Sequence, residues 1–349
     1  MSVAVARRSD QSAEIPANTL RLVRFTAGGG AFALPLDRVP EVVQLDKSAA
    51  RPARGWASMW PRDRQPMPVA DLAFVLGLTT ARDSAARAVL LNDRSGAVAY
   101  GLAVDDVPVA ITVAPDELQA LPASVCPPGQ TVLAASVVRE ADVLLVLDAD
   151  ALIARLAPSV VRGADGRVTE LRPLVRRSMD TARLAPAPGA GRAPGPPRQD
   201  ERVILLAPVE PADGSAGFQP AVPIAWVREV RASEPAHTLP ESPPAILGLL
   251  AWRGYCLPVL DLAWRLTGIP GQGVGEPGAR LLIVGPPAGD PLGVLLVSGV
   301  RGLVNLAPPA PGQPALSLPE TLDAGLLTAW TAARDGTSLA LLAPAALFA

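Results

Sequence analysis

The chain contains the same pattern twice, and this internal repeat restricts the possible folds more than any other feature of its 349 residues. Four blocks in the first part of the chain recur in the same order about 190 residues later. The pairs are ALPLDRVPEVV with AVPIAWVREVR, MPVADLAFVLG with LPVLDLAWRLTG, YGLAVDDV with LGVLLVSGV, and VLLVLDADALI with SLALLAPAALF. The spacing between blocks changes only slightly, as insertions in loops would produce. The sequence therefore predicts two copies of one domain.

The repeat and the composition between its copies predict the domain boundaries. The segment APAPGAGRAPGPPRQD is too rich in Pro and Gly to bury a core, which indicates a linker. The expected organisation is a disordered N-terminus at 1–19, a first domain at 20–157, a linker at 158–200 and a second domain at 201–349.

The first half of the expected linker leaves two possibilities open. Val168, Leu171, Val175 and Met179 are spaced as on one face of a helix, but Pro173 interrupts this pattern. An amphipathic helix that docks on another surface is one interpretation. A solvated linker is favoured.

Within each copy the apolar segments are short and are separated by Gly, Pro and Asp, which is typical of strands. The Gly28-Gly29-Gly30 run joins two of them. It lacks the Lys-Ser/Thr of a phosphate-binding loop and precedes a strand, so a hairpin turn is favoured. Many short strands predict a mostly β architecture that curls into small barrels. The strands expected in the first copy are Leu20–Phe25, Ala31–Leu36, Ala88–Leu91, Ala97–Val104 and Val143–Leu147.

The stretch ILGLLAWRGYCLPVLDL is almost wholly apolar and yet carries Arg253 near its middle. A membrane-spanning helix needs roughly 20 apolar residues, and Gly254 and Pro258 further interrupt this stretch. We predict two buried strands, Leu249–Trp252 and Tyr255–Val259, joined by a tight Arg-Gly turn in which Gly tolerates positive φ. Such a turn would lift the Arg253 side chain into solvent.

Charge and cysteine content exclude several classes of protein. The net charge is −2, with 31 basic and 33 acidic residues, which argues against nucleic-acid binding. The two cysteines form no CxxC motif and no Cys/His cluster, so neither a disulfide framework, a metal site nor a cofactor is expected. Arg7-Arg8 is not followed by an apolar segment, which speaks against a twin-arginine signal. A cytoplasmic protein is expected.

Two aspartates at equivalent positions of the repeat, Asp71 and Asp261, raise the alternative of a bilobal aspartic-type hydrolase. Both are followed by Leu and not by Ser/Thr-Gly, and Asp213-Gly214-Ser215 and Asp335-Gly336-Thr337 have the wrong order. Each of the two aspartates precedes Leu-Ala-x-x-Leu and is expected to cap a short helix. The single histidine, His237, lies in a Pro-rich loop and completes no triad. A binding module without catalytic residues is favoured, and the hydrolase is a remote alternative.

These blocks resemble, in both copies, the CheW family of chemotaxis coupling proteins. That family has a V-x-E-V strand, then G-x-x-N-L-R-G-x-x-x-P-V-x-D-L, then G-x-x-V-D-x-V, and a closing aliphatic run that ends Asp-x-x-x-Leu. This chain has VPEV, VREV, GLLAWRGYCLPVLDL, GLAVDDV and LDADALI. The resemblance implies two tandem CheW-like domains, each a pair of small five-stranded SH3-like β-barrels with short helices.

The resemblance also implies a function and its partners. It implies a non-catalytic adaptor of a bacterial chemosensory array that binds the signalling tips of chemoreceptors and the regulatory domain of a CheA-type histidine kinase, in chemotaxis or motility. Other CheW-like domains remain open as partners, whereas nucleic acid and direct membrane insertion are not expected. The protein would then be cytoplasmic and associated with membrane-anchored receptor arrays. The alternative is a structural or competitive array component that occupies CheW sites without coupling to a kinase.

The family's partner-binding positions carry over onto the V-x-E strand and the Arg-Gly turn. They are Val39, Glu41, Val227, Glu229, Gly248, Arg253 and Gly254. The two valines could equally be core residues and the two glutamates ordinary surface charges. In the first copy the corresponding block, WASMWPRDRQPMP, is longer and has no Arg-Gly, and Arg62 or Arg64 could substitute for it. The second copy has Val297-Ser298 where the family has Val-Asp.

Overall fold

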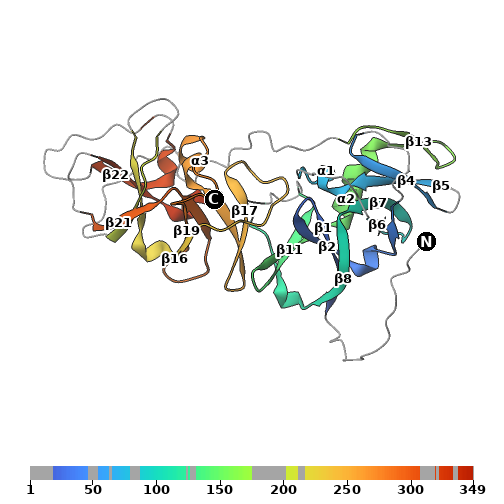
Figure 1. Ribbon diagram of the computed structural model, residues 1–349, viewed down its shortest axis with the longest axis horizontal. Helices are drawn as coiled ribbons and strands as arrows, with labels where there is room; N and C mark the ends of the chain where they lie inside the picture. The colour runs from blue at the N-terminus through green and yellow to red at the C-terminus, as the bar shows by residue number, and fades with distance from the viewer. Residues whose placement is uncertain are drawn as a thin grey trace. The chain divides into compact units, whose positions relative to one another are not determined.

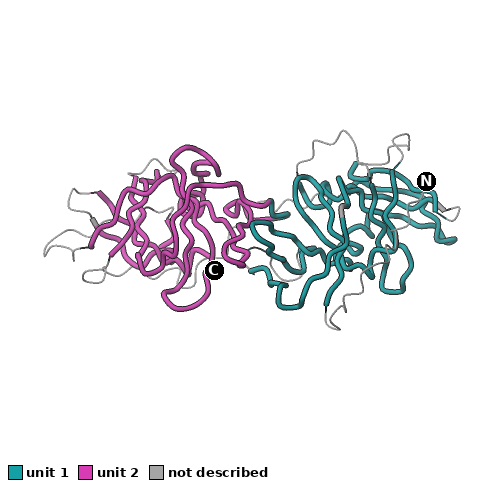
Figure 2. The backbone as a smooth tube through the Cα atoms, turned by 60° about the horizontal axis from the view of Figure 1, so that its bottom comes forward, with its two compact units in different colours: residues 1–178, 238–241 teal, residues 179–237, 242–349 magenta. Residues whose placement is uncertain are grey.

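The computed structural model forms two compact units (Figures 1 and 2). Unit 1 comprises Met1–Ser178 and Thr238–Glu241, and unit 2 comprises Met179–His237 and Ser242–Ala349. All but the last residue of the expected disordered N-terminus, and the Pro/Gly-rich part of the expected linker, lie outside the described residues. The described residues are 19–45, 54–62, 65–78, 87–122, 125, 131–174, 202–210, 217–306, 319, 322–332 and 337–348.

Unit 1 contains two larger sheets. The first is formed by β1 (Leu20–Ala27), β2 (Gly30–Pro35), β8 (Asp106–Val113), β9 (Leu118–Gln119), β10 (Leu133–Arg139) and β11 (Asp142–Leu147). The second is formed by β3 (Val42–Gln44), β4 (Trp56–Arg62), β5 (Gln65–Asp71), β6 (Arg87–Asn92) and β7 (Val98–Val104). Their strand orders are β8-β1-β2-β11-β10-β9 and β3-β6-β7-β5-β4. The first sheet thus has six strands where five were expected, because the two-residue β9 pairs with β10.

Unit 2 repeats this arrangement. Its first sheet is formed by β14 (Arg202–Leu206), β15 (Gln219–Pro223), β21 (Val300–Asn305), β22 (Leu327–Ala332) and β23 (Ser338–Leu342). Its second is formed by β16 (Val227–Ala232), β17 (Ile246–Trp252), β18 (Tyr255–Asp261), β19 (Arg280–Val284) and β20 (Gly293–Val297). The strand orders are β21-β14-β15-β23-β22 and β16-β19-β20-β18-β17. Apart from the additional β9, these are the strand orders of unit 1, which confirms that the repeat is two copies of one mostly β domain.

The turn between β1 and β2 is the glycine hairpin that the sequence predicts. Ala27 faces Gly30 across it, and Gly28 and Gly29 have φ of 56° and 80°. Two successive positive φ angles are typical of the primed hairpin turns that suit strand twist. The glycine run is therefore a turn and not a phosphate loop.

Side chains join strands that lie at or next to opposite ends of a sheet order. Arg139 on β10 donates from Nη2 to the carbonyl of Thr112 on β8 over 2.7 Å. In the second sheet of unit 2, the indole of Trp252 on β17 donates to Glu229 on β16 over 3.0 Å. Such contacts require the sheets to curl on themselves, as small barrels do. Each sheet encloses its own apolar cluster. Val137 and Val69 belong to the clusters of the first and second sheets of unit 1, and Val203 and Val259 to those of unit 2.

The segment expected to begin the linker has a different structure. Val160–Arg162 (β12) and Val168–Leu171 (β13) form an antiparallel hairpin whose turn contains Gly166 at a φ of 76°. The hairpin is held to unit 1, because the indole of Trp56 donates to the carbonyl of Arg172 over 2.9 Å. For residues 160–171, therefore, neither the helix nor the solvated linker is correct. The Asp165-Gly166 pair between the two strands favours a turn, which is why a hairpin forms. Val175 and Met179 lie outside the described residues.

The helices are short, and carboxylates cap three of them. Asp71 caps α1 (Leu72–Val75), Asp148 caps α2 (Ala149–Leu156) and Asp261 caps α3 (Leu262–Thr267), whereas α4 (Pro344–Leu347) has no side-chain cap. A side-chain oxygen at this position accepts from a free N–H of the first turn. The predicted caps at Asp71 and Asp261 are thus confirmed. Among the described residues, no helix is long and apolar enough to cross a membrane.

Candidate functional site

The hairpin of β17 and β18 carries the candidate site of unit 2. Trp252 faces Tyr255 across a two-residue turn, in which Arg253 and Gly254 have φ of 48° and 84°. A positive φ is uncommon for a residue other than Gly and is found mainly in such turns. The Arg253 side chain is 70% exposed. The prediction that a tight turn lifts this cation out of an apolar run is confirmed.

The Arg253 guanidinium has defined neighbours in spite of its exposure. Its Nη2 lies 3.0 Å from Oε2 of Glu229, and its central carbon lies 4.7 Å from the centroid of the Trp252 ring. The indole of Trp252 donates to the same carboxylate oxygen over 3.0 Å. A charge-assisted hydrogen bond and a cation–π contact both favour one orientation of the guanidinium. Because the pair is exposed, it contributes little to folding.

Tyr255 extends this cluster, and we call Glu229, Trp252, Arg253 and Tyr255 the copy 2 tip. The Tyr255 hydroxyl donates to Oδ1 of Asp290 over 2.9 Å, and this hydrogen bond to a carboxylate raises the pKa of the phenol. The Tyr255 and Trp252 rings lie 6.3 Å apart. Sequence reasoning missed both aromatic residues. Their positions on either side of an Arg-Gly turn were the available signal, since residues that flank a two-residue turn face each other.

Two of the residues carried over from the family lie away from the surface. Val39 is only 4% exposed, so its side chain belongs to the core. Gly248 is buried and has a φ of 151°, and a Cβ there would lie 2.4 Å from the carbonyl oxygen of His237. This contact gives Gly248 a structural role. Val227 is half-buried on β16.

Unit 1 has a related but simpler arrangement. Arg62 faces Gln65 across the hairpin of β4 and β5, the position that Trp252 has in unit 2. Its Nη1 lies 3.4 Å from Oε2 of Glu41. An arginine thus takes the place of the indole that binds the equivalent glutamate, whereas Arg64 lies outside the described residues. Of the two substitutes that the sequence suggests, Arg62 is the one seen to contact Glu41.

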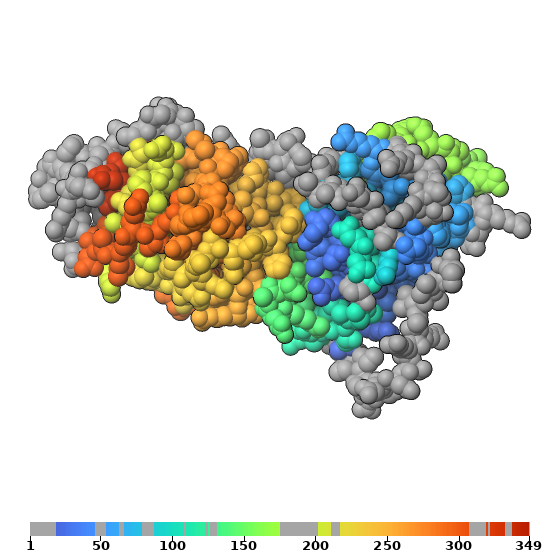
Figure 3. Space-filling model, in the orientation of Figure 1, coloured from blue at the N-terminus to red at the C-terminus, as the bar shows by residue number. Residues whose placement is uncertain are grey.

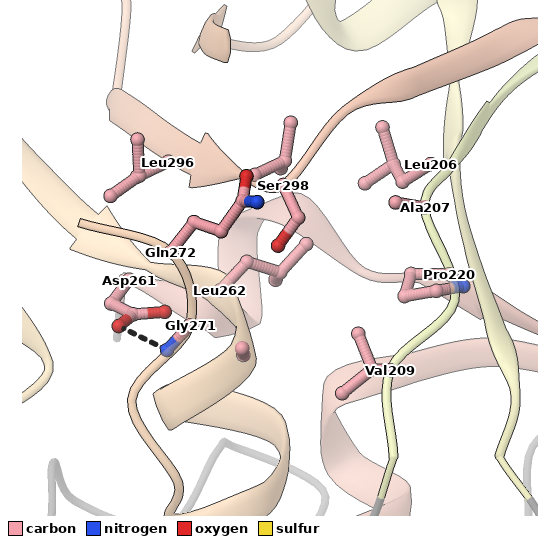
Figure 4. Close-up of a pocket in the computed structure, with 12 residues that line it drawn as sticks. Leu206, Ala207, Val209, Pro220, Asp261, Leu262, Gly271, Gln272, Leu296 and Ser298 are labelled. Atoms are coloured by element: carbon pink, nitrogen blue, oxygen red, sulfur yellow. Dashed lines mark hydrogen bonds between the residues drawn. The ribbon is translucent and has the colours of Figure 1, made fainter. Parts of the chain in front are cut away.

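A small cleft lies between the two sheets of unit 2 (Figure 4). It has room for about one water molecule. Asp261 lies in its wall and is 5% exposed as a residue. Its Oδ1 accepts from the backbone of Trp264 over 3.1 Å and its Oδ2 from the backbone of Gly271 over 2.9 Å. Both oxygens are thus used to hold backbone, and the geometry supports a structural aspartate.

Ser298 lines the same cleft, at the position where the first copy has an acid. That acid, Asp105, accepts through Oδ2 from the backbone of Gly28 over 2.8 Å and so fixes the β1–β2 turn. Ser298 in the second copy has no carboxylate with which to make such a contact. Within the described residues, no group of three or more His, Cys, Asp or Glu could hold a metal ion.

Two units of paired, curled sheets with the same strand order define a protein of tandem double-barrel β domains. The model of the CheW-like domain matches residues 21–157 and 216–349. The chain belongs to the CheW-like domain family.

Individual relatives match shorter stretches. The chain is 36% identical over 85 residues to a probable chemotaxis protein CheW of Rhizobium etli, covering 24% of this chain and 52% of that protein. It is 33% identical over 86 residues to the chemotaxis protein CheW of Rhizobium meliloti, covering 25% and 53%. The chain thus spans about half the length of the curated relatives it matches. A crystal structure of the scaffolding protein TtCheW from Thermoanaerobacter tengcongensis has a TM-score of 0.32 at 22% identity, covering 42% of this chain and 90% of that one.

Proposed function

We propose that this protein is a non-catalytic adaptor of a chemosensory array, which couples the signalling tips of chemoreceptors to the regulatory domain of a CheA-type histidine kinase. The curated relatives are named as chemotaxis proteins, which supports a role in that signalling system. An adaptor needs surfaces that bind other proteins and no reaction centre. The structural roles of Asp71 and Asp261 agree with such a function.

The observation that carries the proposal is the geometry of Arg253. The side chain is 70% exposed, so it has no packing role, yet Glu229 and Trp252 hold it in one orientation. An arginine that is oriented before binding loses less side-chain entropy when a partner arrives. Tyr255 is 38% exposed beside it. Tyr, Trp and Arg are the residues that most often dominate binding energy at protein interfaces.

The test is Arg253→Ala in the full chain, measured against receptor signalling tips and a CheA regulatory domain. Truncation of a central interface arginine costs about 2 kcal/mol, or roughly thirtyfold in affinity. The melting temperature should change little, because surface substitutions usually stay within about 0.5 kcal/mol. Unchanged binding to both partners would show that unit 2 does not couple through its tip.

Glu229→Ala and Glu41→Ala form a matched pair. Glu229→Ala removes the acceptor that orients Trp252 and Arg253 but leaves both of these side chains present. We therefore expect a smaller loss of binding affinity than for Arg253→Ala. This loss should shrink at high salt. An equal loss for Glu41→Ala would mean that both units bind. Binding of receptor tips without the kinase domain would instead support the competitive array component.

A further inference from the structure

The outer strands β8 and β21 occupy the same position in the first sheets of unit 1 and unit 2. Among the described residues, β8 pairs only with β1 and β21 only with β14. An outer strand has backbone N–H and C=O groups on its free side, which can pair with a further strand. The two strands differ in whether other residues of this chain occupy these free backbone groups.

The outer groups of β8 are occupied. Arg87 donates through Nη1 to the carbonyl of Val107 over 3.1 Å, and Arg139 donates through Nη2 to the carbonyl of Thr112 over 2.7 Å. Pro108 has no backbone N–H to offer. Charge and proline are devices by which proteins prevent pairing at an edge. β8 is therefore a protected edge.

The outer side of β21 carries a cation, Arg301, but shares neither of the other two features with β8. In the described part of the chain it contains no proline, and no side chain donates to its carbonyls. Leu303 is 47% exposed and Val300 is 38% exposed, and the stretch lies at the surface in Figure 3. Arg301, Leu303 and Asn305 are exposed in alternation with the half-buried Gly302 and Val304. The outward face of β21 therefore combines a cation, an apolar side chain and an amide.

The positive charge of this edge is not neutralised by described residues. Arg301 and Arg202 are both exposed, and Arg202 faces Asn305 on the neighbouring strand. No carboxylate of the described residues pairs with either guanidinium, whereas on β8 Arg87 lies 3.3 Å from Asp106. A strand with acidic side chains would therefore complement the positive charge at the edge of β21.

We propose that the free edge of β21 binds an extended segment of another protein as an additional strand, and that this segment places acidic and aliphatic side chains two residues apart on one face. The aliphatic side chain would face Leu303 and the acidic one Arg301, since cross-strand neighbours on one face interact directly. The segment of this chain that follows, residues 307–318, contains no Asp or Glu and has four prolines. It therefore lacks both the charge and the N–H groups that the edge requires.

The test uses the full chain and a labelled, end-capped peptide, Ser-Glu-Thr-Val-Thr-Glu-Ser, with fluorescence anisotropy as the readout. We expect saturable binding that weakens about tenfold, or about 1.4 kcal/mol, when the pairing amides of the peptide are N-methylated. A peptide with Lys in place of Glu should also bind more weakly, with the difference shrinking at high salt. Absence of saturable binding, or equal binding of the N-methylated peptide, would refute the proposal.

Substitutions in the chain locate the site. Leu303→Lys and Arg301→Glu should each weaken binding about five- to tenfold, with unchanged melting temperatures because both side chains are exposed. The matched control is Ala110→Lys at the corresponding exposed position of β8, where Ala110 faces Val23 as Leu303 faces Ile204. Equal loss for the control would place binding elsewhere. A dimer in sedimentation that Leu303→Lys abolishes would make a second copy the occupant and the proposal wrong.

Discussion

Gly248 and Gly254 lie six residues apart with positive φ, and they require glycine for different reasons. At Gly254 the φ of 84° belongs to the turn, and a Cβ would meet nothing within 4 Å. At Gly248 a Cβ would lie 2.4 Å from the His237 carbonyl, which accepts from the backbone of Leu249. One glycine therefore serves a turn at the surface, and the other allows two backbone segments to approach in the core.

Substitution by alanine should separate these roles. Gly254→Ala should cost about 1 kcal/mol, because an L-residue pays a modest penalty in a left-handed conformation. Gly248→Ala should cost about 2–4 kcal/mol, because backbone strain adds to a clash with backbone. Urea unfolding of both variants measures the difference. Equal costs would show that the segment around His237 moves away without penalty.

At the scale of single elements, the two aspartate caps are equivalent in sequence but not in surroundings. Asp71 is half-buried and accepts from Phe74 over 3.2 Å. Asp261 is buried and uses one oxygen for α3 and the other for Gly271. The loop after α3 is thus tied to the cap of its own helix.

Asparagine at the two positions should therefore have unequal effects. Asp71→Asn should stay within about 1 kcal/mol, because Asn caps comparably well. Asp261→Asn should cost about 2 kcal/mol, since the amide keeps one acceptor and leaves a buried N–H without its partner. Unfolding free energies in urea provide the comparison. An acid-dependent proteolytic activity that either change abolishes would instead restore the hydrolase alternative.

Local signals in the sequence were sufficient for turns and caps, but not for contacts across a sheet. The Gly28-Gly29 turn, the Arg253-Gly254 turn and both aspartate caps depend on a few neighbouring residues. The bond between Trp252 and Glu229 joins strands at opposite ends of a sheet order, and no local pattern encodes that distance. The β12–β13 hairpin was missed because its apolar residues also fit a helical spacing, which made the period ambiguous.

At the scale of the whole molecule, the two units share a strand order but differ in their details. Edge strand β16 has six residues where β3 has three. The copy 2 tip contains two aromatic residues, whereas the contact in unit 1 is an ion pair between Arg62 and Glu41. The two units therefore present different side chains at equivalent places of one fold.

The units should also fold separately when the chain is cut in the Pro/Gly-rich segment. Fragments 1–178 and 200–349 should each unfold cooperatively, because each holds both of its sheets. Fragment 1–160 lacks Arg172 and the buried Leu174, so it loses the bond to Trp56 and should melt several degrees lower. Calorimetry of the three fragments is the measurement. Absence of a transition in both larger fragments would mean that the copies are not independent domains.

In each unit the first sheet is completed by a strand that is synthesised late, β11 in unit 1 and β23 in unit 2. β2 pairs in parallel with β11, where Phe32 faces Leu145, and β15 pairs in parallel with β23, where Ala221 faces Leu341. Contacts between residues so distant along the chain must await the closure of a long loop, which slows folding. During synthesis, the early hairpins of a unit therefore remain without their central partner until nearly the whole unit has emerged. Nascent chains are most exposed to aggregation in that interval.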